Sequence, residues 1–163
     1  MLSDAKAPVP PMVQLRAIAP GDLAELYLHQ LDPESNRVAV ANPRDSQAFA
    51  AHWAKVLADP DVVARAIIAD GAMVGYITCF AMDRKHWVGY WIARQQWGRG
   101  IATGALRQLL QEVGIRPLHA RAARSNAASI RVLERCGFAV TGYHMAPADD
   151  RFPACEEAVL RLE

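Results

Sequence analysis

Three absences exclude several classes of function for this 163-residue chain. Its three cysteines, Cys79, Cys136 and Cys155, form no CxxC pair, and no two of its five histidines lie four residues apart. We therefore expect neither a metal site nor a disulfide framework, and free thiols fit a reducing cytoplasm. No apolar run approaches the roughly 18 residues of a membrane-spanning helix, so no membrane partner is expected. Residues 1–12 lack the basic start and apolar stretch of a secretory signal, and we expect them to form a flexible lead-in.

The charge is nearly balanced overall, at +1, but it is distributed unevenly. The segment from Arg84 to Arg135 holds ten basic and two acidic residues, a net charge of +8, whereas the remainder holds eight basic and fifteen acidic residues, a net charge of −7. The basic segment lacks the interleaved aromatic residues of single-strand binders, so nucleic acid is not expected as a partner. It favours a polyanionic ligand of modest size, such as a phosphorylated cofactor, and the acidic remainder favours a cationic partner.

Composition and periodicity predict a mixed α+β fold in a single domain over residues 13–163. Hydrophobic residues make up 52% of the chain, which argues against disorder. Alternating and β-branched stretches predict strands over residues 13–18, 62–69, 73–82, 86–92, 118–122, 140–145 and 158–162. Apolar residues at helical spacing predict helices over residues 22–31, 43–58, 101–113 and 126–136. The first helix is expected to begin at Asp22, in a capping box with Glu25, and to end at Asp32-Pro33. The expected architecture is a mostly antiparallel sheet of about six to seven strands flanked by about four helices.

The loop between Ile92 and Ile101 carries the clearest sign of a binding function. Gly98 and Gly100 lead directly into an amphipathic helix, whose first backbone N–H groups lack intrahelical partners and lie at the positive end of the helix dipole. A pyrophosphate can bind there without a lysine. A phosphate loop of the Walker type is excluded because no glycine–lysine pair occurs in the chain.

Two other interpretations of this loop stay open. Gly98, Gly100 and Gly104 are one residue off the spacing of a dinucleotide fingerprint, and Arg121 stands about where that fingerprint has an acid. Only a cofactor with a 2′-phosphate, such as NADP, would suit that arrangement. The glycine pair is also compatible with a tight connection that binds nothing.

Three motifs resemble the GNAT acyltransferase superfamily. Gln95-x-x-Gly98-x-Gly100, between a strand and a helix, resembles its motif A. The stretch from Asn126 to Gly137-Phe138 resembles its second motif, an asparagine followed by a helix that ends in Gly-Phe. Gly89-Tyr90-Trp91-Ile92 resembles the branch that contains the ribosomal-protein N-terminal acetyltransferases. The expected order of elements matches this fold from Val13 onward.

The resemblance implies an acetyl-CoA-dependent N-acetyltransferase that transfers an acetyl group directly to a primary amine, on a peptide N-terminus or a small cationic amine, without a metal. The strand ending at Ile92 would separate from its neighbour and pair with the pantetheine arm, and a backbone amide near Ile92 would polarise the thioester carbonyl. The implied cofactor-binding residues are Ile92, Arg94, Gln95, Gly98, Arg99, Gly100, Ile101, Ala102, Thr103, Asn126 and Ser129. Asn126 is equally well placed to cap the following helix.

The catalytic residues implied by the resemblance depart from its common pattern. Many members have a tyrosine seven residues after the asparagine, but Leu133 stands there. Ser129 matches the serine that the ribosomal branch is thought to use as the acid instead. A glutamate base would fall at Trp87, so the adjacent His86 is a candidate base, as are His29, Glu34, Asp83, Asp149 and Asp150. Water or desolvation of the amine is a further alternative.

The acceptor site is expected between the first two helices and the loop from Ala146 to Cys155, with Trp53, Trp87 and Tyr143 as candidate lining residues. The segment from Asp32 to Arg37 lies where members of this superfamily build the acceptor wall. A homodimer through the terminal strands also fits the fold. Because the usual tyrosine and glutamate are absent, a non-catalytic acyl-CoA sensor or a partner-binding module is the alternative function.

Overall fold

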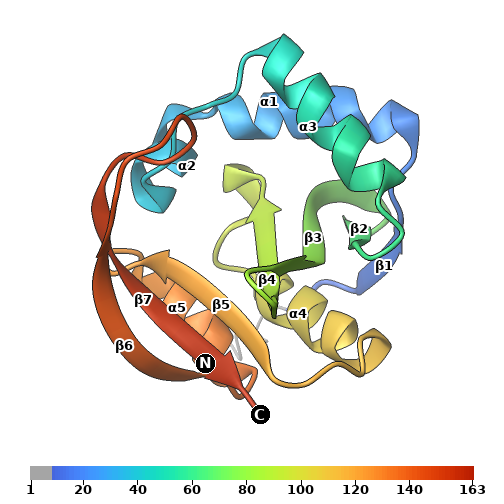
Figure 1. Ribbon diagram of the computed structural model, residues 1–163. Helices are drawn as coiled ribbons and strands as arrows, with labels where there is room; N and C mark the ends of the chain where they lie inside the picture. The colour runs from blue at the N-terminus through green and yellow to red at the C-terminus, as the bar shows by residue number, and fades with distance from the viewer. Residues whose placement is uncertain (1–8) are drawn as a thin grey trace, which may run out of the picture.

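The computed structural model describes residues 9–163. Its centre is one seven-stranded sheet, in which every neighbouring pair of strands is antiparallel except β4 and β5 (Figure 1). In spatial order the strands are β1 (Val13–Ala17), β2 (Val63–Ala69), β3 (Ala72–Met82), β4 (Lys85–Ile92), β5 (Leu118–Ala123), β7 (Cys155–Leu162) and β6 (Ala139–Ala146). The predicted mixed fold and its mostly antiparallel sheet are confirmed. Of the predicted lead-in, residues 1–8 lie outside the described part of the chain.

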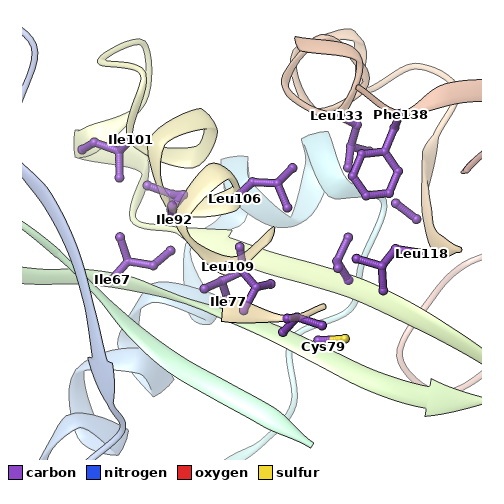
Figure 2. Packing of buried hydrophobic residues seen from close by; sticks show 14 of the residues in the cluster. Ile67, Ile77, Cys79, Ile92, Ile101, Leu106, Leu109, Leu118, Leu133 and Phe138 are labelled. Atoms are coloured by element: carbon purple, nitrogen blue, oxygen red, sulfur yellow. The ribbon is translucent and has the colours of Figure 1, made fainter. Parts of the chain in front are cut away.

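Helices pack on both faces of the sheet. They are α1 (Leu23–Leu31), α2 (Pro33–Ala39), α3 (Ser46–Ala58), α4 (Ile101–Glu112) and α5 (Ala127–Arg135), with short 3-10 turns at Pro20–Asp22 and Arg94–Gln96. The larger core lies between the sheet and the pair α4 and α5, where Leu106 and Leu109 pack toward Ile77 of β3 (Figure 2). A smaller core under α1 and α3 is built on Phe49 and Trp53. The two cores fix the sheet between its helices.

Helix α2 was not among the predicted helices, of which there were about four. Asp32 does end α1, as predicted, but its carboxylate also accepts the backbone N–H of Ser35 at 2.9 Å and so caps a new helix. Pro33 occupies the first turn of α2, where a missing N–H costs nothing. The same two residues thus end one helix and begin the next.

The capping box predicted for α1 is wrong. The carboxylate of Asp22 accepts the backbone N–H of Ala19 at 2.8 Å and pairs with Arg16 at 2.6 Å, and it makes no cap hydrogen bond to α1. This hydrogen bond with Arg16 holds the pKa of Asp22 below its usual value. The acidic side chain therefore ties the end of β1 to the turn before α1.

Strands β4 and β5 are paired only at their beginnings. His86 pairs with Leu118 and Trp87 with His119, and beyond these two pairs the strands diverge, as Figure 1 shows. Within residues 9–163, the backbone of β4 from residue 88 to residue 92 therefore has no strand on that side. This split is the separation that the family resemblance implied for the strand ending at Ile92.

Strand β3 holds the end of β4 on its other side at unusually close range. Gly75 of β3 pairs with Ile92, and the N–H of Ala93 donates to the carbonyl of Val74 at 2.9 Å. A Cβ atom at Gly75 would lie only 2.1 Å from the carbonyl oxygen of Trp91. Only glycine permits this approach, which sets the course of β4 beside the split.

Candidate active site

Two cavities meet at the split between β4 and β5. One, of about 410 Å³, lies toward the loop 93–100 and the beginnings of α4 and α5, and we call it the cofactor cleft. The other, of about 600 Å³, lies on the side of α3 and the loop 147–154, and we call it the acceptor cavity. The residues that line both are Ala39, Tyr90, Trp91, Asn126 and Ser129. A reaction between one ligand in each cavity would take place at these residues.

The cofactor cleft contains a row of unpaired backbone donors. Gly98 and Gly100 adopt positive φ values of 75° and 76°, which turn the chain from the 3-10 turn into α4. The first backbone N–H in this region to find an acceptor is that of Gly104, bonded to the carbonyl of Gly100 at 3.0 Å. Within residues 9–163, no partner accepts from the six N–H groups of residues 98–103. This arrangement is typical of an anion site at a helix N-terminus.

The basic side chains that line the cleft are not those expected from the sequence. Arg131 and Arg135 of α5 line it, one turn apart on the same face of the helix. Arg94 instead pairs with Asp32 at 3.1 Å, and Arg99 pairs with Asp70 at 2.8 Å. The spacing of two arginines by four residues, in the helix after Asn126, was the signal in the sequence that could have found them.

The structure brings most of the predicted cofactor-binding residues together and leaves three outside. Those that line the cleft are Ile92, Gly98, Gly100, Ile101, Ala102, Thr103, Asn126 and Ser129. Arg94, Gln95 and Arg99 do not line it, and as cofactor ligands they stay predictions. The indole N–H of Trp97 donates to the carbonyl of Ile92 at 3.0 Å and holds the loop against the strand end. The side chain of Asn126 accepts the N–H of Ser129 at 3.3 Å, so its capping role is observed.

Ser129 has a hydroxyl partner that the sequence motifs did not indicate. The hydroxyl of Tyr90 lies 2.7 Å from Ser129 Oγ, and both residues border both cavities. Burial raises the pKa of Tyr90 to about 12, so this hydroxyl stays protonated at neutral pH. Leu133, at the position where a tyrosine is common, is buried in the core. Strand alternation, which points Tyr90 to the same face as Val88 and Ile92, was the available signal.

His86 is not at the site. It lies at the start of β4, six residues before Ile92, and lines neither cavity. At the rise of a β-strand this separation is about 20 Å, which is beyond hydrogen-bond reach of an amine at the split. Among the other candidate bases, Asp149 lines the acceptor cavity, whereas His29, Glu34, Asp83 and Asp150 line neither.

The acceptor cavity is formed only in part by the elements that the sequence indicated. Helix α3 and the loop 147–154 line it, but no residue of α1 does. None of the segment from Asp32 to Arg37 lines it either, and Ser35 of that segment lines the cofactor cleft instead. Trp53, Trp87 and much of the loop from Ala146 to Cys155 line it. Tyr143 does not, and its ring instead lies under the guanidinium of Arg124 at 4.0 Å. An imidazole–carboxylate pair also lines the cavity: His144 Nε2 lies 3.6 Å from Glu157 Oε1. These two groups were not among the predicted residues.

Residues 9–163 contain neither a cluster of metal-ligating side chains nor a membrane-spanning helix. Nowhere in this part of the chain do three or more histidine, cysteine, aspartate or glutamate side chains come together in a way that would hold a metal ion. None of its helices is both long enough and apolar enough to cross a membrane.

Comparison with known proteins identifies the family. A family model described as an acetyltransferase (GNAT) domain matches residues 13–139. The putative ribosomal N-acetyltransferase YdaF of Bacillus subtilis (strain 168) is 30% identical over 145 residues, which cover 80% of this chain and 79% of that protein.

Solved structures agree with this fold. Spermidine N-acetyltransferase from Vibrio cholerae, in complex with CoA and spermine, superposes with a TM-score of 0.79 at 16% identity and covers 92% of this chain and 94% of its own. RimJ of Mycobacterium smegmatis, in complex with CoA-disulfide, gives a TM-score of 0.76 at 22% identity and covers 94% of this chain and 85% of its own. The split sheet, the row of free amides and these matches lead to one conclusion: the chain belongs to the GNAT family of acetyltransferases.

Proposed function

We propose that this chain transfers the acetyl group of acetyl-CoA directly to a primary amine, on a small molecule or at a protein N-terminus. The observation that carries the proposal is the row of six unpaired N–H groups at residues 98–103, five of them in residues that line a cleft opening onto the split between β4 and β5. A phosphorylated cofactor suits the amides, and its extended arm suits the free edge of the strand. Proteins similar to this chain include N-acetyltransferases named for ribosomal proteins and for spermidine.

The residues of the cleft fit the parts of acetyl-CoA. The amides of residues 98–103 would hold the pyrophosphate, with Arg131 and Arg135 supplying positive charge beside it. The unpaired edge of β4 up to Ile92 would hydrogen-bond the amide groups of the pantetheine arm. The amide nitrogen of Asn126 is free to donate, because only its oxygen is used in capping. Acetyl-CoA supplies the activated acetyl thioester.

Tyr90 and Ser129 are the groups that we assign to proton delivery. The hydroxyl of Tyr90 would donate to Ser129 Oγ, which turns the serine proton toward the cleft and the departing sulfur. The nitrogen would release one proton to water as the C–S bond breaks, and water would return a proton to Ser129, so that one proton passes overall from nitrogen to sulfur. A backbone N–H near Ile92 would stabilise the negative charge on the carbonyl oxygen as the amine attacks. The acceptor would approach through the other cavity and meet the thioester beside Trp91. No covalent bond to the enzyme is needed.

The location and assembly are part of the same proposal. We infer a cytoplasmic protein, in keeping with three cysteines that are free in the structure. A homodimer would form along β6, the edge strand, where Tyr143 and Met145 are 50% and 68% exposed. Light scattering distinguishes this dimer from a monomer, and a monomeric mass would overturn it.

Ligand-induced stabilisation tests the cofactor directly. At a hundredfold excess over its Kd, a ligand that binds only the folded chain adds about 2.7 kcal/mol to the free energy of unfolding. For a chain of this size the expected rise in Tm is about 5–10 °C. We expect this rise with acetyl-CoA and none with NADP, followed by thiol release in a screen of amines. A rise with NADP alone would overturn the proposal and restore the dinucleotide interpretation of the loop.

Removal of the two hydroxyls tests the proton-delivery step. Ser129→Ala is expected to lower kcat by about 100-fold, in the range of general acid catalysis, and Tyr90→Phe by about tenfold. Both variants should keep the Kd for acetyl-CoA within about threefold, because the pyrophosphate cradle is untouched. The double variant should be no slower than Ser129→Ala, since Tyr90 acts through the serine.

Two substitutions outside both cavities serve as matched controls for that test. Tyr27→Phe and Ser125→Ala remove the same groups from positions that line neither cavity and should leave kcat unchanged. Full turnover by Ser129→Ala would remove the serine from the mechanism. Additive losses in the double variant would mean that Tyr90 acts independently of it.

A further inference from the structure

The acceptor cavity contains two arginines without acidic partners. Arg44 and Arg151 both line it and both are half-buried. Within the described residues, 9–163, no carboxylate lies within 4 Å of either guanidinium. Arg121, the third arginine of the cavity, is different because it lies 3.9 Å from Glu157. Two partly desolvated cations near each other are costly unless a ligand supplies the missing negative charge.

The main chain at both arginines is held in place by neighbouring residues. The buried amide of Gln30 accepts the N–H of Arg44 at 2.8 Å and donates to its carbonyl at 2.9 Å. The N–H of Asn42 donates to the carbonyl of Arg151 at 2.6 Å, and the guanidinium of Arg151 donates to the carbonyl of Asn42. Two loops far apart in the sequence are thus joined so that both side chains face one cavity.

The positive charges of the two arginines affect the ionisable residues beside them. Burial, together with the charges of Arg44, Arg151 and Lys55, lowers the pKa of His52 to about 4, so this lining residue is neutral at physiological pH. Burial raises the pKa of Tyr76, which keeps its hydroxyl protonated, and no partner for that hydroxyl is found among residues 9–163. The cavity therefore offers two guanidinium groups and a phenol as donors.

The loop 147–154 contains Asp149 and Asp150, and of these only Asp149 lines the cavity, where it does not pair with the arginines. The carboxylate of Asp149 accepts the backbone N–H groups of Arg151 at 2.8 Å and Phe152 at 2.7 Å, and so fixes the turn. Burial and the charge of Arg44 lower the pKa of Arg151, and they outweigh the opposing effects of Tyr76 and Asp149. The positive charge at this end of the cavity is thus left for a ligand.

The arginines lie beside the place of reaction. The guanidinium of Arg151 lies over the ring of Trp91 at 5.3 Å, and Trp91 borders both cavities. We propose that the acceptor carries an anionic group, a carboxylate or a phosphate, a short spacer away from its reactive amine, and that Arg44 and Arg151 bind this group. The inference rests on the proposed function and names the acceptor class of the same site. Charge over the whole chain favoured a cationic acceptor, but the lining of the cavity favours one that also bears negative charge.

Matched acceptors measure this preference in turnover. With saturating acetyl-CoA, thiol release is followed for the standard L-amino acids against their carboxamides, for O-phosphoethanolamine against ethanolamine, and for spermidine. We expect the best anionic acceptor to exceed its neutral partner, and to exceed spermidine, by roughly tenfold or more in kcat/KM, because hydrogen bonds to charged groups are strong. Comparison of the amino acid pairs with the O-phosphoethanolamine pair shows whether the anionic group is a carboxylate or a phosphate. Equal rates within every pair would overturn the anion site and leave the acetyltransferase function standing.

Variants assign the preference to the two side chains. Arg44→Gln and Arg151→Gln should each reduce the anionic-to-neutral ratio toward one, by lowering kcat/KM for the anionic acceptor and not for the neutral one. Arg44→Gln is the safer of the two, because Gln30 binds only the main chain at that position. Arg124→Gln, outside both cavities, is the matched control and should leave the ratio unchanged.

A binding measurement separates failure of this inference from failure of the proposed function. The same pairs are titrated onto the complex of the protein with CoA, which has no acetyl group to transfer. The anionic member of a pair should bind the original protein roughly tenfold more tightly than its neutral partner does, whereas the two members should bind Arg44→Gln equally tightly. Preferential binding without turnover would keep the anion site and overturn the proposed reaction. No preference, or no binding of either member, would overturn the anion site.

Discussion

Replacement of Gly75 by alanine is expected to lower the free energy of unfolding by about 2 kcal/mol and to reduce acetyl transfer by about 100-fold. The added Cβ would lie 2.1 Å from the carbonyl oxygen of Trp91 and 3.1 Å from the Cα of Ile92. Both are backbone atoms, so no side-chain rotation relieves the overlap and the end of β4 must move. That movement displaces Tyr90 and Trp91 from the junction of the two cavities.

A glycine with open surroundings provides the control for Gly75→Ala. Gly142 lies in β6, and no atom of residues 9–163 lies within 4 Å of the place that an added Cβ would occupy, so Gly142→Ala should change neither stability nor rate appreciably. Urea unfolding, the Kd for acetyl-CoA and kcat are measured for both variants. If Gly75→Ala had the same stability and activity as the original protein, the close approach of β3 and β4 would not be what positions the site.

The local signals in the sequence predicted the cofactor side of the site well, because that side is built from short contiguous segments. The glycines before α4 and the asparagine before α5 act through backbone geometry a few residues away, which a sequence pattern records. The glycines turn the chain into α4 with positive φ values, and the Asn126 cap that the sequence allowed is observed. Strand alternation and helical spacing likewise placed all seven strands and four of the five helices.

Residues whose roles depend on distant partners were the ones that the sequence did not reveal. Ser129 of α5 meets Tyr90 of β4 although the two residues are 39 positions apart in the chain. Arg94 and Arg99 flank the loop in the sequence, yet each pairs with an acid from another segment. Gly75 shows nothing unusual in the sequence, because its importance arises from the backbone of the neighbouring strand.

The acceptor side was the hardest part to predict, for the same physical reason. Arg44 and Arg151 are separated by most of the chain, and hydrogen bonds to Asn42 bring their loops together. The net charge of the chain adds up ionised groups that lie far apart in the fold, whereas recognition of the acceptor depends on the groups that line its cavity. The balance of charge over the chain therefore said little about this end of the site.

Replacement of Gly100 by valine is expected to weaken acetyl-CoA binding by at least about 100-fold, because several amide hydrogen bonds to the pyrophosphate are lost together. Gly100 has a φ of +76° at the N-cap of α4, and a β-branched residue strongly disfavours this conformation. In the described part of the chain nothing lies within 4 Å of an added Cβ at this position, so the effect is conformational rather than a clash. The loop would relax to negative φ and turn its N–H groups away from the cleft.

A valine at Gly71 serves as the control, because it introduces backbone strain without disturbing the N–H groups of residues 98–103. Gly71 has a φ of +83° in the hairpin turn between β2 and β3, also with nothing within 4 Å, and it does not line the cofactor cleft. In Gly71→Val the free energy of unfolding should therefore fall by a similar amount, about 1–2 kcal/mol, and the affinity for acetyl-CoA should stay that of the original protein. Calorimetric titration with acetyl-CoA compares the two variants at equal folded fraction. If Gly100→Val bound acetyl-CoA as tightly as Gly71→Val, the amides of residues 98–103 would not be the phosphate site, and Arg131 with Arg135 would have to hold the phosphates alone.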